Sequence, residues 1–67
     1  MSQNVNNFVQ ECRNRKKITQ EELGNSIGVT RQTIIAIEKG NYTPSVLLAL
    51  KIAKYFNISV EKLFIIK

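Results

Sequence analysis

Three consecutive polar residues in the middle of the chain, Arg31, Gln32 and Thr33, carry side chains that can hydrogen-bond a ligand. An arginine can bond guanine in two places, a glutamine can bond adenine in two places, and a threonine offers a hydroxyl and a methyl group. All three fall in the first turn of an expected helix. A helix that enters the DNA major groove end-on presents its side chains to base edges from this turn. These residues can therefore read a DNA sequence.

Two short helices that meet at a glycine turn must position these side chains. Thr19 and Glu22 have the spacing of a capping box, so the first of the two helices is predicted to begin at Thr19. Gly28 suits the left-handed residue that closes this helix, Thr30 caps the next one, and Gly40 ends it. Two helices joined by so short a turn predict a helix-turn-helix. Free amides at both helix starts also attract phosphate.

The stretch TQEELGNSIGVTRQTIIAIEKG, followed by NYTPS and LALKIAKYF, resembles the Xre/Cro family of helix-turn-helix repressors over about the whole chain. The resemblance implies an all-α fold, a compact bundle of about five short helices of the lambda-repressor-like type. The second and third helices would form the helix-turn-helix. It also implies a sequence-specific DNA-binding transcriptional regulator, a repressor that binds an inverted-repeat operator as a homodimer.

The resemblance also implies a role for individual residues. The base-contacting set is Arg31, Gln32, Thr33 and Ala36, and the phosphate-contacting set is Gln20, Lys39, Asn41, Tyr42 and Thr43. The family commonly pairs an arginine of the first helix with a glutamate late in the recognition helix, here Arg13 and Glu38. Ile35 departs from the family, in which a polar residue is common there. Its side chain either touches a thymine methyl or is simply exposed.

Length and composition set the class of protein. The 67 residues are expected to form one domain, residues 1–67, and the net charge of +5 favours an anionic partner such as nucleic acid. The only cysteine, Cys12, is expected to be a small buried hydrophobe, which fits a reducing cytoplasm. No apolar run approaches the roughly 20 residues of a spanning helix. We expect a cytoplasmic protein with no metal, cofactor or small-molecule ligand.

Helical periodicity organises the rest of the chain. A first helix is expected from Val5, with one buried face, and its basic last turn either complements the helix dipole or contacts phosphate. Thr43 is expected to cap the helix that ends at Phe56, with Pro44 in its first turn. Ser59 is expected to cap a short last helix. The apolar stripe expected for the long helix comprises Val46, Ala49, Leu50, Ala53 and Phe56, with Leu48 and Ile52 beside it.

The chain ends in large apolar residues, which either cover the core or meet the same surface on a second copy. We favour a two-fold dimer, because DNA readers of this kind need two recognition helices roughly 34 Å apart. The expected dimer interface comprises Leu47, Ile58, Phe64, Ile65 and Ile66.

A protein-interaction module and an enzyme are the two alternatives to a DNA-binding repressor. An antitoxin-like protein-interaction module that also binds DNA is the alternative, although little chain is left for a neutralising segment. An enzyme fits worst, because the sequence has no histidine and offers no pairing of nucleophile and base. The loop with Asn41, Tyr42 and Thr43 either holds phosphates or is merely capped, with Tyr42 packed on the core edge.

Overall fold

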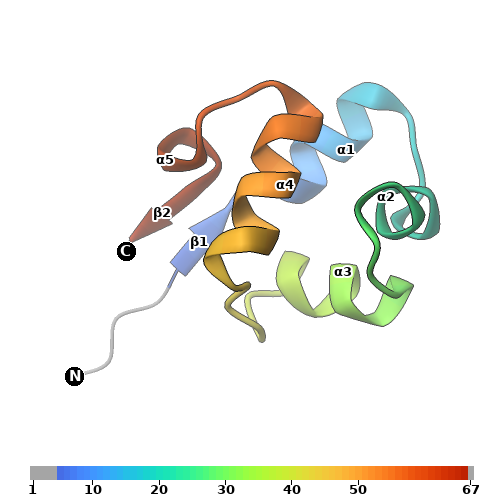
Figure 1. Cartoon of the computed structure of the whole chain (residues 1–67), viewed down its shortest axis with the longest axis horizontal. Coiled ribbons are helices and arrows are strands. Elements are labelled where there is room, and N and C mark those ends of the chain that lie inside the picture. The colour runs from blue at the N-terminus through green and yellow to red at the C-terminus, as the bar shows by residue number, and fades with distance from the viewer. Residues whose placement is uncertain (1–4, 67) are drawn as a thin grey trace.

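The computed structural model describes residues 5–66, which form five helices and a two-stranded antiparallel sheet (Figure 1). The chain is therefore mostly helical, and the expectation of an all-α fold is corrected by the small sheet. Among the described residues, no helix is both long and apolar enough to cross a membrane. The elements are β1 (Val5–Asn7), α1 (Val9–Lys16), α2 (Gln20–Ile27), α3 (Arg31–Glu38), α4 (Val46–Phe56), α5 (Val60–Leu63) and β2 (Phe64–Ile66).

The sheet joins the two ends of the described chain. Val5 lies opposite Ile66, and Asn7 lies opposite Phe64. The amide of Phe8 also donates to the carbonyl of Leu63 at 3.0 Å. The predicted first helix therefore begins at Val9 and not at Val5, because the residues before it pair with the C-terminal strand.

The expected caps of α2 and α3 are confirmed. Thr19 and Glu22 form a reciprocal capping box: the Thr19 hydroxyl accepts from the Glu22 amide at 3.0 Å, and the Glu22 carboxylate accepts from the Thr19 amide at 2.7 Å. Gly28 ends α2 in the left-handed conformation at φ 83°. The Thr30 hydroxyl then accepts from the Thr33 amide at 3.2 Å. The sequence therefore fixes where the helix that carries Arg31 and Gln32 begins.

The start of α4 lies two residues later than predicted. Ser45 is its cap, and the Ser45 hydroxyl accepts from the Leu48 amide at 3.1 Å. Thr43 and Pro44 therefore belong to the loop and not to the cap and first turn. At the other end, Asn57 adopts the left-handed conformation and ends the helix as expected.

The buried face of α4 also differs from the predicted stripe. Leu48, Ile52 and Ala53 are buried, whereas Val46 is 78% exposed and Leu50 is 51% exposed. Apolar residues surround most of this helix, so its pattern does not select one face. The core collects side chains from all five helices: Val9, Leu23, Ile27, Ile34, Ile37, Leu48, Ile52, Ala53 and Leu63.

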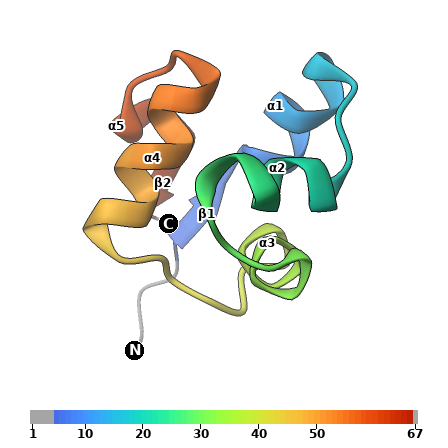
Figure 2. The same ribbon diagram turned by 45° about the vertical axis from the view of Figure 1, so that its right-hand side comes forward.

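Gly24 lets α2 approach the turn that leads into α3. A Cβ at this position would lie 2.7 Å from the backbone oxygen of Val29 and 3.3 Å from that of Thr30. A side chain there would push against backbone, which cannot rotate away as a side chain does. Gly24 therefore serves the close packing of α2 against this turn. In Figure 2, α2 lies across α3, which is seen end-on.

Candidate nucleic-acid interface

The first turn of α3 presents the predicted base-reading side chains to solvent. Arg31 and Gln32 are exposed, and within residues 5–66 neither side chain has a hydrogen-bond partner. Ala36, one turn later, is half-buried, as is Ile35. The free ends of an arginine and a glutamine beside a small alanine make a surface that can hydrogen-bond base edges and approach them closely.

Thr33 has a second task in the same turn. Its hydroxyl lies 3.1 Å from the Thr30 hydroxyl in a hydrogen bond, and its amide donates to Thr30. The Thr33 hydroxyl is thus part of the helix cap. Its second hydrogen-bonding position and its methyl group remain for a base.

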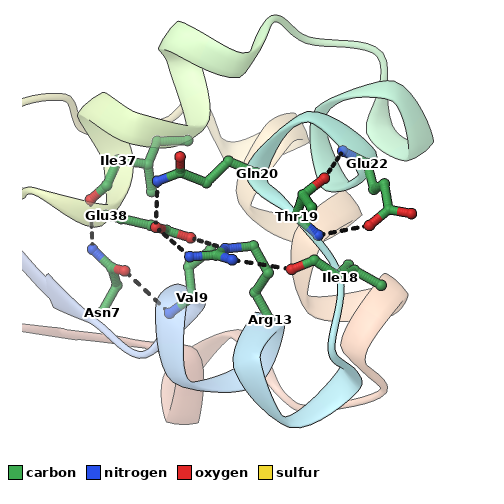
Figure 3. Close-up of polar contacts among 9 residues, drawn as sticks. All are labelled: Asn7, Val9, Arg13, Ile18, Thr19, Gln20, Glu22, Ile37 and Glu38. Atoms are coloured by element: carbon green, nitrogen blue, oxygen red, sulfur yellow. Dashed lines mark hydrogen bonds and ion pairs between the residues drawn. The ribbon is translucent and has the colours of Figure 1, made fainter.

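A polar network holds the far end of α3 against α1 and α2 (Figure 3). The structure brings Arg13 and Glu38 together: Arg13 Nε donates to Glu38 Oε2 at 2.8 Å, and Arg13 Nη2 donates to Glu38 Oε1 at 3.2 Å. Their side chains are only 12% and 3% exposed. Arg13 Nη1 also donates to the Ile18 carbonyl at 3.0 Å. A two-pronged, charge-assisted contact of this kind fixes orientation as well as distance.

Gln20 belongs to this network, which the sequence did not reveal. Its side-chain Nε2 donates to Glu38 Oε1 at 3.1 Å, so the first residue of α2 is bonded to the last residue of α3. A glutamine amide has two hydrogens, and Glu38 takes one of them. The other leaves Gln20 able to contact a phosphate as the family resemblance implies.

A shallow groove lies beside Gln20. Two cationic side chains on its rim, Lys17 and Arg31, come from the segment before α2 and from the start of α3. The amides at the start of α2 add partial positive charge, although the capping box occupies two of them. The lining also carries the carboxylate of Glu21, which Lys17 and Arg31 outnumber, so the groove is suited to an anionic group such as a DNA phosphate. Its lining is Arg13, Lys17, Ile18, Thr19, Gln20, Glu21 and Arg31.

The loop after α3 carries the remaining predicted phosphate contacts. Lys39, Asn41, Tyr42 and Thr43 are all exposed. The Asn41 amide donates to the Ala36 carbonyl at 2.9 Å, which keeps the loop against the end of the helix. Tyr42 is 46% exposed and lines a shallow pocket with Val29, so its ring is partly packed and partly free. In Figure 1 this loop and α3 form the lower border of the part of the chain that the structure describes.

Asn7 is a positioning residue that the sequence analysis missed. Its side-chain Nδ2 donates to the Ile37 carbonyl at 2.8 Å, and its Oδ1 accepts from the Val9 amide at 3.1 Å (Figure 3). One side chain therefore links β1, the start of α1 and the last turn of α3. An asparagine directly before an apolar run is a common helix-start signal and could have marked it.

The residues predicted for the dimer interface differ in exposure and lie on α4, on β2 and in the segment between α4 and α5. Ile65 and Ile66 lie on β2 and are 39% and 70% exposed. Ile58 and Phe64 are half-buried and pack against the core. Leu47 is 64% exposed and lines a pocket beside the end of α2.

Comparison with known proteins gives consistent matches. The HTH_3 helix-turn-helix family matches residues 9–63. The HTH-type transcriptional regulator YgzD of Bacillus subtilis is 55% identical over 60 residues, which are 90% of this chain and 91% of YgzD. Among solved structures, the restriction-modification controller protein C.AhdI from Aeromonas hydrophila superimposes with a TM-score of 0.73 at 28% identity, covering 81% of this chain and 82% of C.AhdI. The P22 c2 repressor, solved with a synthetic operator, superimposes with a TM-score of 0.76 at 26% identity, covering 79% of this chain and 80% of the repressor chain.

Proposed function

Because this chain belongs to the HTH_3 family of helix-turn-helix transcriptional regulators, we propose that it is a repressor that binds an inverted-repeat operator as a homodimer. The P22 c2 repressor, whose structure contains operator DNA, has the same fold and supports this proposal. Repression follows where the operator overlaps a promoter.

The observation that carries the proposal is the free first turn of α3. Arg31 and Gln32 project from a helix whose start is capped by Thr30 and whose end is held by Glu38. Because the helix is fixed at both ends, binding does not have to order its backbone, and the ordering cost is confined to the side chains that contact the bases. We assign the base contacts to Arg31, Gln32, Thr33 and Ala36, which lie on α3.

The phosphate contacts lie on both sides of α3. Before it, the second amide hydrogen of Gln20 donates to one phosphate, beside the groove with Lys17. After it, Lys39 and the loop residues Asn41, Tyr42 and Thr43 hold another. Contacts on both sides of a helix set how deeply it enters the groove, and the net charge of +5 adds long-range attraction.

The experiment that tests the proposal is selection from a pool of duplexes with a randomised centre. The wild-type protein is expected to enrich an inverted repeat whose half-sites lie one helical turn apart. The double variant Arg31→Ala, Gln32→Ala is the control, because both side chains are exposed and their loss should leave the fold intact. Enrichment of no sequence by the wild-type protein would contradict the proposal, as would the same motif from both proteins.

A further inference from the structure

β2 has one paired edge and one free edge. The amide of Phe8 donates to the carbonyl of Leu63, so the backbone groups of Leu63 and, by alternation, of Ile65 point to β1. Those of Phe64 and Ile66 point away from it. In the part of the chain that the structure describes, the sheet has only these two strands, so no strand pairs with the outer edge of β2. A free edge is a template for pairing with another chain.

Exposed apolar side chains lie on β2 and on α4. Ile66 shares a face of the ribbon with Phe64, which packs against the core, so that face is turned toward the helices. Leu47 and Lys51 mark the side of α4 beside α2. Val46 and Leu50, one turn apart, are exposed on another part of the helix surface and do not line this pocket. In Figure 1, α5 and β2 lie on the other side of α4 from α2.

We propose that the outer edge of β2 and the Val46–Leu50 stripe of α4 bind a second copy of this chain across a two-fold axis at Ile65. A two-fold rotation turns a strand into its own antiparallel partner, so β2 is complementary to itself. Phe64 and Ile66 then exchange backbone hydrogen bonds with the partner strand. The two α4 helices lie on the same face of the joined sheet, where Val46 and Leu50 meet their copies.

The exposed area fits a dimer of this size. Val46, Leu50, Ile65 and Ile66 are 78%, 51%, 39% and 70% exposed. Together they leave roughly 400 Å² of apolar side-chain surface, within the range in which patches mark interaction sites. This is about half of the ~800 Å² that each partner buries in a standard interface, so the proposal requires the backbone edge of β2 and neighbouring residues to bury the remainder. β2 itself carries no charge or proline, the usual protection against edge pairing.

The proposed interface is coupled to DNA reading. β2 pairs with β1, and Asn7 at the end of β1 donates to Ile37 in the last turn of α3. The two recognition helices are therefore fixed relative to the two-fold axis. The inference rests on the proposed function, since an inverted repeat selects for such a pair. In the proposed dimer interface, the residues that α4 contributes are Val46 and Leu50, in place of the Leu47 predicted from the sequence.

The first test compares Leu50→Lys with Leu47→Lys by sedimentation equilibrium. The two leucines are on the same helix and are 51% and 64% exposed, so the change is matched in kind and environment. We expect Leu50→Lys to raise the dimer dissociation constant by about 100-fold and Leu47→Lys to change it by less than about 3-fold. Circular dichroism checks that both are folded. Equal effects, or a larger effect of Leu47→Lys, would overturn the proposal.

A covalent test reads the register directly. With the axis at Ile65, this residue lies opposite its own copy in a non-hydrogen-bonded pair, whose Cα atoms are about 4.5 Å apart, close enough for a disulfide. Ile65→Cys in a Cys12→Ala background is expected to form a disulfide-linked dimer on mild oxidation by oxidised glutathione. Leu47→Cys in the same background is the control. No linked dimer from Ile65→Cys, or equal linkage in the control, would overturn the register.

Failure of this inference and failure of the proposed function are distinguishable. A wild-type protein that is monomeric at high concentration but still enriches a DNA motif would overturn the interface and leave DNA reading in place. A dimer that Leu50→Lys breaks but that enriches no motif would support the interface and contradict the repressor.

Discussion

Glu38→Ala should destabilise the fold far more than loss of another carboxylate. The Glu38 side chain is 3% exposed and accepts two hydrogen bonds from Arg13 and one from Gln20. The variant removes all three acceptor contacts and leaves the guanidinium of Arg13, itself 12% exposed, without a counter-charge. An unpaired charge in such a place is the main cost.

The magnitude follows from the burial of the pair. Breaking a buried ion pair by removing one partner costs about 3–5 kcal/mol. Arg13 keeps its bond to the Ile18 carbonyl and some contact with water, so we expect the lower end, about 3 kcal/mol. Domains of this size have only about 3–10 kcal/mol of stability in total. A loss of 3 kcal/mol corresponds to a fall in Tm of roughly 12–24 °C.

The assay is unfolding in urea, followed by circular dichroism, with Glu61→Ala as the control. Glu61 is an exposed carboxylate, so its loss should change the free energy of unfolding by less than about 0.5 kcal/mol. The double variant Arg13→Met, Glu38→Leu removes both charges and should recover most of the loss, because apolar residues can replace a buried pair.

Two results would contradict this role of the buried Arg13–Glu38 pair. One is a Glu38→Ala protein with the same free energy of unfolding as Glu61→Ala. This would mean that the charges of Arg13 and Glu38 are solvated, so that removing Glu38 leaves no buried, unpaired charge. The other is a double variant no more stable than Glu38→Ala, which would mean that the buried charge of Arg13 is not the cause.

Two further variants test the nucleic-acid interface, and a third tests the turn between α2 and α3. Gln32→Ala should weaken binding to the selected duplex by about 1–3 kcal/mol and relax preference at one base pair in competition assays; equal loss on every sequence would make Gln32 a phosphate contact. Lys17→Ala should weaken binding to all duplexes alike and reduce the slope of log affinity against log salt by about 1, whereas an unchanged slope would place Lys17 off the DNA. Gly24→Val should lower stability in urea by about 2 kcal/mol relative to Asn25→Val, since a Cβ at Gly24 meets backbone at 2.7 Å; equal stabilities would show that the turn can move aside.

Local signals were enough to predict the helix-turn-helix. Thr19 with Glu22, Gly28 and Thr30 each act within a few residues of chain, so the sequence places both helix starts and the turn between them. The base-reading positions Arg31 and Gln32 follow from the cap at Thr30. The family resemblance also suggested that Arg13 and Glu38 form a pair. Hydrophobic periodicity could not have suggested this pair, because the two residues are 25 positions apart in the sequence.

The sequence pattern did not predict the structural features that depend on contacts between residues far apart in the chain. β1 and β2 have three residues each, too few to separate a period of two from one of 3.6, and their pairing joins opposite ends of the chain. The buried face of α4 could not be read, because Val46 and Leu50 are as apolar as the Leu48 and Ile52 that the core buries. The bond from Gln20 to Glu38 likewise depends on how α2 crosses α3.

Whether the first turn of α3 reads bases is tested by the ratio of the affinity for the selected operator to the affinity for a scrambled duplex of the same composition, at physiological salt. If it does, we expect a ratio of about 10³ or more, as specific DNA-binding proteins show. Equal affinities with the same salt dependence would contradict it, because charge alone would then account for the binding.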